Sequence, residues 1–368
     1  MNKHSYSQAA IIGIFFAILL LPQVIQLGFA SRQDTTEENR NLTAFPQKLH
    51  WRKLARGLEE YYNDRIPFRN EMLKGCGIIQ KELFPFTLGN IILGENDFCF
   101  YAPKSQENTL LQYNGTLRMP YYKRERNRKF LEKLYRKLSS ENIGFLLVVA
   151  PDKIQIYPEY LPERRKYQPA SNAPSEQLRK HLQEFNSPVP VIFLKDTLLY
   201  AKKFYGDNLF YRADTHWNPV GGYLGAREII RHFSPDEKLP AIGEFQIRFG
   251  STPEPDDMKN QLLHKNSFSD TVYMTKEPAV DKFAGKIEIV GPGHLKTVNP
   301  SARDHRKLLL YRDSFTNNMI PYLSNHFAEV HYVWTHKVSL GQIAEISPDI
   351  LVLEYVSRIL IKMQNKLR

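Results

Sequence analysis

Short apolar runs that alternate with helical patterns constrain the fold of this 368-residue chain more than any other feature. Runs that are apolar throughout suit strands buried on both faces, and helices between them supply the crossover connections of a parallel sheet. We therefore expect an α/β fold, a three-layer sandwich around a mainly parallel, five-stranded sheet. The runs lie at residues 145–150, 189–194, 308–311, 330–334 and 350–353, and the helical patterns lie near 175–185, 218–232, 317–326, 338–346 and 355–367.

Residues 234–306 interrupt this pattern, because they are polar and rich in Pro, Gly and Asp. We interpret them as an insertion with a few extra strands, placed as a wall or lid over a site. Helices are expected over 51–63 and up to about 83, followed by a strand pair over 88–101. The predicted divisions are a signal-anchor segment at 1–30, a polar linker at 31–50, and one domain at 51–368 with the insertion at about 234–306.

The N-terminus predicts where the protein is located. From Ala9 to Ala30 only Gln23 and Gln26 carry polar side chains, and a helix of this length, at about 1.5 Å per residue, spans the roughly 30 Å core of a bilayer. Two interpretations stay open: an uncleaved signal-anchor helix in the inner membrane, or a signal peptide cut after Ala30. We favour the anchor, since the two glutamines make a poor cleavage region. Both place residues 31–368 in the periplasm or another extracytoplasmic space.

The net charge of the chain limits the classes of molecule that it is expected to bind. The chain has 50 Lys and Arg against 39 Asp and Glu, a net charge of +11, which favours polyanionic sugars, membrane surfaces or nucleic acid. Export then excludes nucleic acid. Two cysteines cannot form a disulfide scaffold or a four-thiolate zinc site. Cys76 and Cys99 could pair in an oxidising compartment, or Cys76 could be an ordinary buried thiol.

The segment from Tyr211 to Pro219 contains the first group of candidate catalytic residues. In extended backbone Asp214 and His216 project to the same side, and a carboxylate beside an imidazole fixes its tautomer and stabilises the imidazolium. Asn218 is a good N-cap and Pro219 a good first helical residue, so the pair should lie in a loop that leads into a helix. The alternative is a surface Asp–His pair with Trp217 packed beneath it.

The segment from Lys307 to Asn318 contains the second group. It has the pattern of a strand, a tight turn and a helix, which places Ser314 at the carboxyl edge of a parallel sheet and against a helix N-terminus that can hold an oxyanion. The alternative is that Ser314 is a plain N-cap. A serine hydroxyl needs a neighbouring base, and the base needs an orienting acid. The two segments together supply all three groups at one sheet edge.

Other candidates for chemistry are weaker. His326, His331 and His336 recur every five residues, a spacing that suits neither one helix face nor one strand face, so we expect no metal site and no cofactor. The Lys and Arg clusters at 123–137 and 163–166 fit solvated faces better than a binding surface for an anionic polymer.

The motifs resemble those of the SGNH-hydrolase-like alginate O-acetyltransferases, the AlgJ/AlgX type, and of the related DHHW proteins. The most specific are Asp214-Thr215-His216-Trp217 and Arg312-Asp313-Ser314-Phe315, in that order and about a hundred residues apart. Simple SGNH esterases have their serine early and their Asp-His pair late, so the motif order is permuted here. Further segments that carry the resemblance are 38–42, 62–69, 149–153 and 157–159.

This resemblance implies an SGNH-like fold and a polysaccharide O-acetyltransferase with Asp214, His216 and Ser314 as its catalytic residues. Arg312 stands where the simple esterase motif has Gly, so the oxyanion donor is not carried over; Asn317 or Asn318 could supply it, and Phe315, Arg312 and Trp217 are further oxyanion or substrate candidates. The family implies that a membrane-bound O-acyltransferase relays the acetyl donor. An esterase of the same fold, or a non-catalytic polysaccharide-binding scaffold of an export complex, stays an alternative.

Overall fold

The structure is a computed structural model that describes residues 16, 43–46, 51–63, 87–162, 169–239, 246–249, 272–275 and 285–363. The chain divides into two compact units, one of Met1–Leu88 with Asn260–Lys265 and one of Gly89–Lys259 with Asn266–Arg368. The first unit contains α2 (Trp51–Asn63), a predicted helix, and the short strand β1 (Thr87–Leu88). In the described part of the chain, no helix is both long enough and apolar enough to span a bilayer.

Several sequence predictions fall on segments that the structure does not describe. They include the helix up to about residue 83, nearly all of the apolar segment from Ala9 to Ala30, the linker apart from 43–46, Cys76, the basic cluster at 163–166 and most of the insertion between 240 and 284. The predicted domain boundaries and the signal-anchor helix therefore stay predictions.

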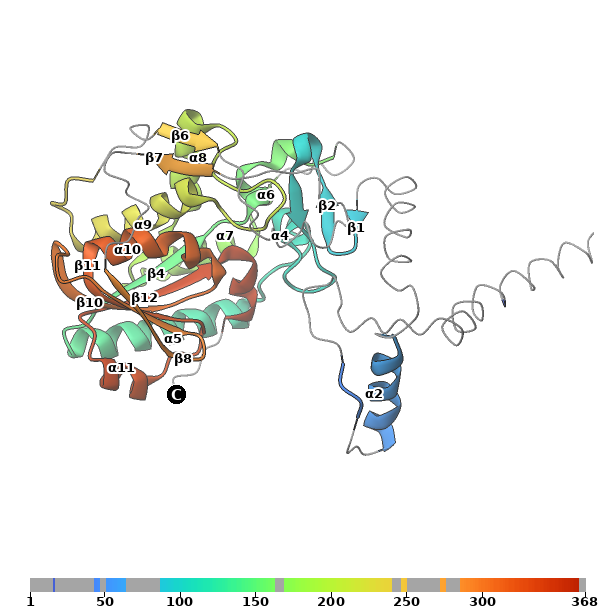
Figure 1. The fold of residues 1–368 in the computed structure, drawn as a ribbon, viewed down its shortest axis with the longest axis horizontal. Helices are drawn as coiled ribbons and strands as arrows, with labels where there is room; N and C mark the ends of the chain where they lie inside the picture. The colour runs from blue at the N-terminus through green and yellow to red at the C-terminus, as the bar shows by residue number, and fades with distance from the viewer. Residues whose placement is uncertain are drawn as a thin grey trace, which may run out of the picture. The chain divides into compact units, whose positions relative to one another are not determined.

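The second unit is built on a seven-stranded mixed sheet (Figure 1). In the order given below, the first five strands are parallel to one another, and each of the last two is antiparallel to the strand before it. In spatial order the strands are β5 (Val191–Phe193), β4 (Gly144–Ala150), β12 (Ile350–Val356), β10 (Asp304–Tyr311), β11 (Phe327–Val333), β9 (His294–Val298) and β8 (Lys286–Gly291).

The predicted parallel strands are confirmed, but the strand number is wrong, because the sheet has seven strands rather than five. The extra hairpin, β8 and β9, comes from the end of the segment expected as an insertion, and β9 pairs with β11. This pairing covers an edge that β11 would otherwise leave open. The hairpin is half-polar, with the repeat Lys286-Ile287-Glu288-Ile289, so it lacks the continuous apolar run of the buried strands. A second antiparallel pair in this region joins β6 (Gln246–Phe249) and β7 (Val272–Thr275).

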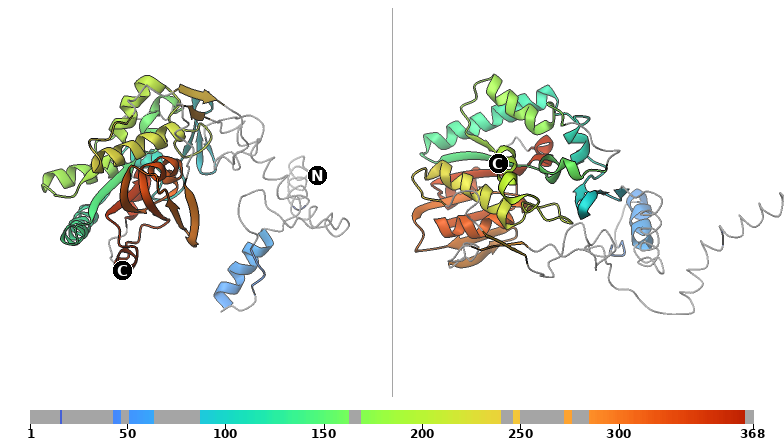
Figure 2. Two further views of the ribbon diagram at one scale, coloured as in Figure 1. Left: turned by 60° about the vertical axis from the view of Figure 1, so that its left-hand side comes forward. Right: turned by 90° about the horizontal axis from the view of Figure 1, so that it is seen from above.

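Helices cover both faces of the sheet, so the core has two layers (Figures 1 and 2). Alternate side chains of β10 serve the two layers: Leu308 and Leu310 pack in one hydrophobic cluster, and Leu309 and Tyr311 pack in the other. The first layer includes residues of α8 (Lys195–Tyr205), α9 (Pro219–Phe233) and α10 (Ile320–His326); the second includes residues of α5 (Tyr121–Ser140), α7 (Pro174–Glu184) and α11 (Leu340–Ile346).

Two predicted helices differ from the structure. The helix expected over 355–367 is a short 3₁₀ segment, η6 (Ser357–Lys362), because β12 continues to Val356 rather than ending at residue 353. The helix expected over 317–326 begins as the 3₁₀ segment η5 (Ser314–Met319), and α10 follows it. Pro321 lies in the first turn of α10, where its missing N–H is tolerated.

A small antiparallel hairpin confirms the strand pair expected over 88–101. β2 (Ile91–Leu93) pairs with β3 (Cys99–Tyr101) across the short 3₁₀ turn η1 (Glu95–Asp97). Cys99 is buried in β3, and because Cys76 is not described, the possible disulfide stays untested. The remaining short helical segments are α4 (Thr109–Tyr113), α6 (Lys153–Ile156) and η2 (Pro158–Tyr160).

Candidate active site

Ser314 lies where β10 passes into η5. The strand ends at Tyr311, and Asp313 caps the turn by accepting a hydrogen bond from the Phe315 N–H at 2.9 Å. Ser314 is therefore the first residue of a helical turn, a position whose N–H has no partner within the turn. Among the described residues, none accepts a hydrogen bond from this N–H. The expected strand–turn–helix arrangement around Ser314 is thus present.

Asp214 and His216 lie in the loop between α8 and α9, and the structure agrees with the predicted start of α9. Asn218 is the N-cap, and its side chain accepts hydrogen bonds from the N–H groups of Val220 at 2.9 Å and Gly221 at 3.3 Å. Pro219 is the first residue of the helix. The Asp-x-His pair is therefore held directly before a well-capped helix.

The two segments bring the three predicted side chains into one hydrogen-bonded chain. His216 Nδ1 is 2.6 Å from Asp214 Oδ1, and His216 Nε2 is 2.6 Å from Ser314 Oγ. An ionised carboxylate only accepts hydrogen bonds, so Asp214 places the imidazole proton on Nδ1 and leaves Nε2 to accept from the serine hydroxyl. The same Asp214 oxygen also accepts from the His216 backbone N–H at 2.7 Å. This arrangement can activate a hydroxyl as a nucleophile.

Side chains next to these three residues join the two loops. Trp217 Nε1 donates to the Phe315 carbonyl at 2.8 Å, and Asn318 Nδ2 donates to the Trp217 carbonyl at 2.7 Å. Trp217 and Phe315 are fully buried and pack edge to face. From the sequence, Trp217, Phe315 and Asn318 were predicted to be oxyanion or substrate candidates. In the structure they connect the loops, and the Asn318 amide nitrogen uses one of its two hydrogens in this contact.

Arg312 and Asn317 form a second contact beside Ser314. The buried Arg312 donates through Nη1 to the Asp313 carbonyl at 3.1 Å and to the Asn317 side-chain oxygen. Burial lowers the pKa of Arg312 from its ordinary value. The Asn317 amide nitrogen has no partner among the described residues, so Asn317, the second N–H of Asn318 and the Ser314 N–H stay candidate oxyanion donors.

Glu354 is a site residue that the sequence reasoning missed. This fully buried carboxyl in β12 accepts through Oε2 from the Asp313 N–H and from the Thr316 hydroxyl, both at 3.0 Å, so it supports the nucleophile's turn from both sides. Its other oxygen, Oε1, is buried without a hydrogen-bond partner among the described residues. Burial, followed by the nearby Asp313, raises the pKa of Glu354 well above its ordinary value. A glutamate inside the apolar run 350–356 was the available signal.

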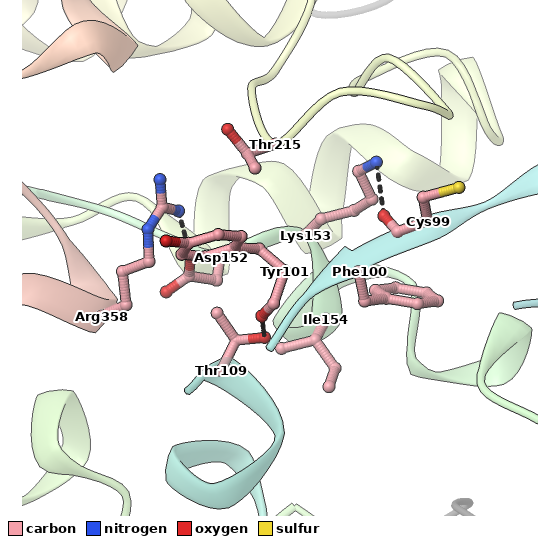
Figure 3. A pocket seen from close by; sticks show the side chains of 9 residues that line it. All are labelled: Cys99, Phe100, Tyr101, Thr109, Asp152, Lys153, Ile154, Thr215 and Arg358. Carbon is pink, nitrogen blue, oxygen red and sulfur yellow. Dashed lines mark hydrogen bonds and ion pairs between the residues drawn. The ribbon is translucent and has the colours of Figure 1, made fainter. Parts of the chain in front are cut away.

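A pocket adjoins these residues (Figure 3). Thr215, between Asp214 and His216, forms part of its wall, as does Arg358, whose guanidinium lies 5.3 Å from the Phe315 ring. Arg358 pairs with the buried Asp152, and Lys153 donates to the backbone carbonyls of Cys99 and Arg212 at 2.9 and 2.7 Å. The space is small, with a volume of about 10 Å³. The other lining residues are Phe100, Tyr101, Thr109 and Ile154.

Comparison with known proteins confirms the resemblance that the motifs carry. The sequence model of a family described as "SGNH hydrolase-like domain, acetyltransferase AlgX" matches residues 110–280, a stretch that includes Asp214 and His216 and ends before Ser314. The chain is 25% identical over 248 residues to "Probable alginate O-acetylase AlgJ" of Pseudomonas fluorescens, a match that covers 64% of this chain and 54% of that protein.

A second curated relative and a solved structure give further matches. The protein of the same name from Azotobacter vinelandii is 24% identical over 214 residues, which cover 57% of this chain and 51% of the relative. The chain thus spans about half the length of these curated relatives. Bacillus cereus PatB1 superimposes with a TM-score of 0.51 and 16% identity, over 75% of this chain and all of that one. The shared architecture is an SGNH-like α/β fold.

Proposed function

We propose that this chain is an O-acetyltransferase that moves acetyl groups onto hydroxyls of an exported or cell-surface polysaccharide. The observation that carries the proposal is the continuous chain from Asp214 through His216 to Ser314, with 2.6 Å at each side-chain contact. The curated relatives named alginate O-acetylase support this choice of reaction and acceptor. The convergence of the three side chains argues against a non-catalytic scaffold, in which they would have no reason to meet.

The geometry supports a two-step reaction. His216 Nε2 takes the proton of the Ser314 hydroxyl as Oγ attacks the acetyl carbonyl, and Asp214 stabilises the imidazolium that forms. The tetrahedral oxyanion collapses, the bond to the leaving group breaks, and His216 returns the proton to that group. A sugar hydroxyl, deprotonated by His216, then attacks the acetyl-serine ester, and Ser314 recovers its proton.

The oxyanion would lie at the start of η5. Among the described residues the Ser314 N–H has no hydrogen-bond partner, and the amide nitrogens of Asn317 and Asn318 are the side-chain candidates beside it. Hydrogen-bond donors fixed before the reaction begins stabilise a developing oxyanion without having to reorganise.

The source of the acetyl group belongs to the same proposal. Acetyl-CoA is cytoplasmic, so an exported enzyme needs a membrane-bound O-acyltransferase to pass the acetyl group across the inner membrane. We place the domain at the periplasmic face, held there by the apolar segment from Ala9 to Ala30. Cell fractionation with and without that segment tests this location; recovery of the full-length chain in the cytosol would contradict it.

To test the function, purified protein is incubated with p-nitrophenyl acetate as the acetyl donor, with and without de-acetylated alginate oligosaccharides as the acceptor. The proposal predicts that mass spectrometry finds acetylated oligosaccharide with wild type and none with Ser314→Ala. Formation of acetate alone at every acceptor concentration would identify the esterase alternative, which differs in letting water reach the acyl-enzyme.

A further inference from the structure

Trp334 is a large apolar side chain that the proposed mechanism does not use. It directly follows β11 and is 51% exposed, whereas Trp217 is fully buried. Its backbone N–H donates to the Gly293 carbonyl at 2.7 Å, which ties its position to the turn of the β8–β9 hairpin. Because β11 is parallel to β10, the ends that lead to Trp334 and Ser314 lie at the same edge of the sheet.

Arg312 connects the Trp334 ring to the nucleophile. Its guanidinium carbon lies 4.4 Å from the centre of the ring, a cation–π contact. The same guanidinium donates to the Asp313 carbonyl at 3.1 Å, and that carbonyl belongs to the peptide group that carries the Ser314 N–H. Arg312 thus contacts both the Trp334 ring and the turn that carries Ser314, while Trp334 itself stays 51% exposed.

The order of the strands separates Trp334 from the pocket of Figure 3. Along the sheet the order is β4, β12, β10, β11, and their ends lead in turn to Asp152 and Lys153, to Arg358, to Ser314 and to Trp334. Ser314 therefore lies between the pocket and the exposed ring. Neighbouring strands are about 4.8 Å apart, roughly the length of one sugar unit, so a chain of sugars that crosses this edge can present one unit to each position.

From these contacts we infer that Trp334 is a stacking platform for one sugar ring of the acceptor, on the opposite side of Ser314 from the Arg358 pocket. The apolar C–H face of a pyranose covers an indole ring well, and burial of the exposed half of Trp334 would favour binding. The inference rests on the proposed function, since it assigns this surface to the acceptor. It makes Trp334 a residue that sets acceptor affinity.

A binding measurement without catalysis tests this inference. In a Ser314→Ala background, calorimetric titration with a de-acetylated alginate oligosaccharide should show that Trp334→Ala weakens Kd roughly three- to tenfold, in line with the energy of one aromatic stacking contact. Trp334→Phe, which keeps a ring, should recover most of the loss. Equal affinity in the Trp334→Ala protein, or absence of binding to the parent protein, would overturn the inference.

Phe185 offers a matched control. It is 43% exposed and has Arg128 stacked 4.6 Å from its ring, but it precedes β5 rather than following a strand of the active edge. Phe185→Ala should leave oligosaccharide affinity unchanged, and an equal loss in this variant would contradict a specific role for Trp334.

Kinetics separate the inference from the proposed function. In the active protein, Trp334→Ala should raise the KM for the oligosaccharide several-fold more than it changes hydrolysis of p-nitrophenyl acetate. Equal losses in both reactions would make the ring a support of the serine turn and would overturn the inference. If wild type binds the oligosaccharide through Trp334 but never acetylates it, the transferase proposal fails and the binding surface stands.

Discussion

Asp214 uses one carboxylate oxygen for two contacts, with the imidazole and with the backbone N–H of His216. The contact with the imidazole sets its tautomer, and the contact with the backbone N–H fixes the position of the His216 backbone from which the ring projects. Asp214→Asn presents an amide that can donate to Nδ1 and leave the proton on the wrong nitrogen. We expect kcat/KM for p-nitrophenyl acetate to fall roughly 10³- to 10⁴-fold with the fold retained.

The control for this substitution is Asp196→Asn, which removes an exposed ion pair with Arg179. Surface pairs of this kind contribute little to stability, so activity and thermal unfolding should match wild type. A loss smaller than about tenfold in the Asp214→Asn protein would contradict the role of Asp214 in fixing the tautomer.

The buried carboxyl of Glu354 leads to a prediction about how the stability of the protein depends on pH. Its raised pKa means that it binds a proton on folding once the pH exceeds its ordinary value, so its contribution favours folding at low pH and declines as the pH rises. Glu354→Gln keeps an oxygen for the Asp313 N–H and needs no proton. The free energy of unfolding of the Glu354→Gln protein, measured in urea, should therefore increase relative to that of wild type as the pH rises from 5 toward 8.

Glu354→Leu tests the hydrogen bonds themselves. It leaves the Asp313 N–H and the Thr316 hydroxyl without their acceptor in a buried place, a loss of about 1–3 kcal/mol for each group. We expect it to lose activity, whereas Glu354→Gln retains it, and Glu345→Gln on the exposed face of α11 should change neither. A stability difference between Glu354→Gln and wild type that does not vary with pH would rule out a neutral Glu354.

At the scale of elements, the site depends on how closely α9 approaches η5. A Cβ added at Gly222 would lie 2.2 Å from the Asn318 carbonyl oxygen and 2.6 Å from its carbon, so no side chain fits there. Alanine normally stabilises a helix interior relative to glycine. Gly222→Ala should instead lower the free energy of unfolding by about 1–3 kcal/mol and reduce activity, because it displaces the segment that carries Ser314.

Gly341→Ala in α11 is the matched helix control, since the nearest atom to the added Cβ is the Ser339 hydroxyl at 3.8 Å. Chemical denaturation of both variants should show Gly341→Ala equal to or more stable than wild type. Equal behaviour of the two variants would contradict close α9–η5 packing as a condition for the site.

Some of these elements could be predicted from the sequence alone, and others could not. Continuous apolar runs predicted the five parallel strands, and Asn218-Pro219 predicted the start of α9, because burial on both faces and capping are local properties of the chain. Extra strands were expected within 234–306, but not that the β8–β9 hairpin joins the main sheet, because its pairing with β11 is a contact between distant residues. Glu354 escaped prediction because its role depends on Asp313 and Thr316, which approach it only in the folded protein.

At the scale of the whole molecule, residues 98 positions apart meet because two loops lie at one edge of the sheet. The order of Asp-x-His before Ser is therefore no obstacle to a shared site, since strand order in space and not order in the chain decides which loops are neighbours. The pocket with Arg358 and the exposed Trp334 flank the nucleophile along that edge.

The central claim is that Ser314 carries the acetyl group between donor and acceptor. Acid quenching during turnover of p-nitrophenyl acetate, followed by digestion and mass spectrometry, reads this directly. We expect one added acetyl group on the peptide that contains Ser314, lost when an oligosaccharide acceptor is added before the quench and absent in Ser314→Ala. Continued turnover with acetyl on no peptide, or on a residue other than Ser314, would contradict it.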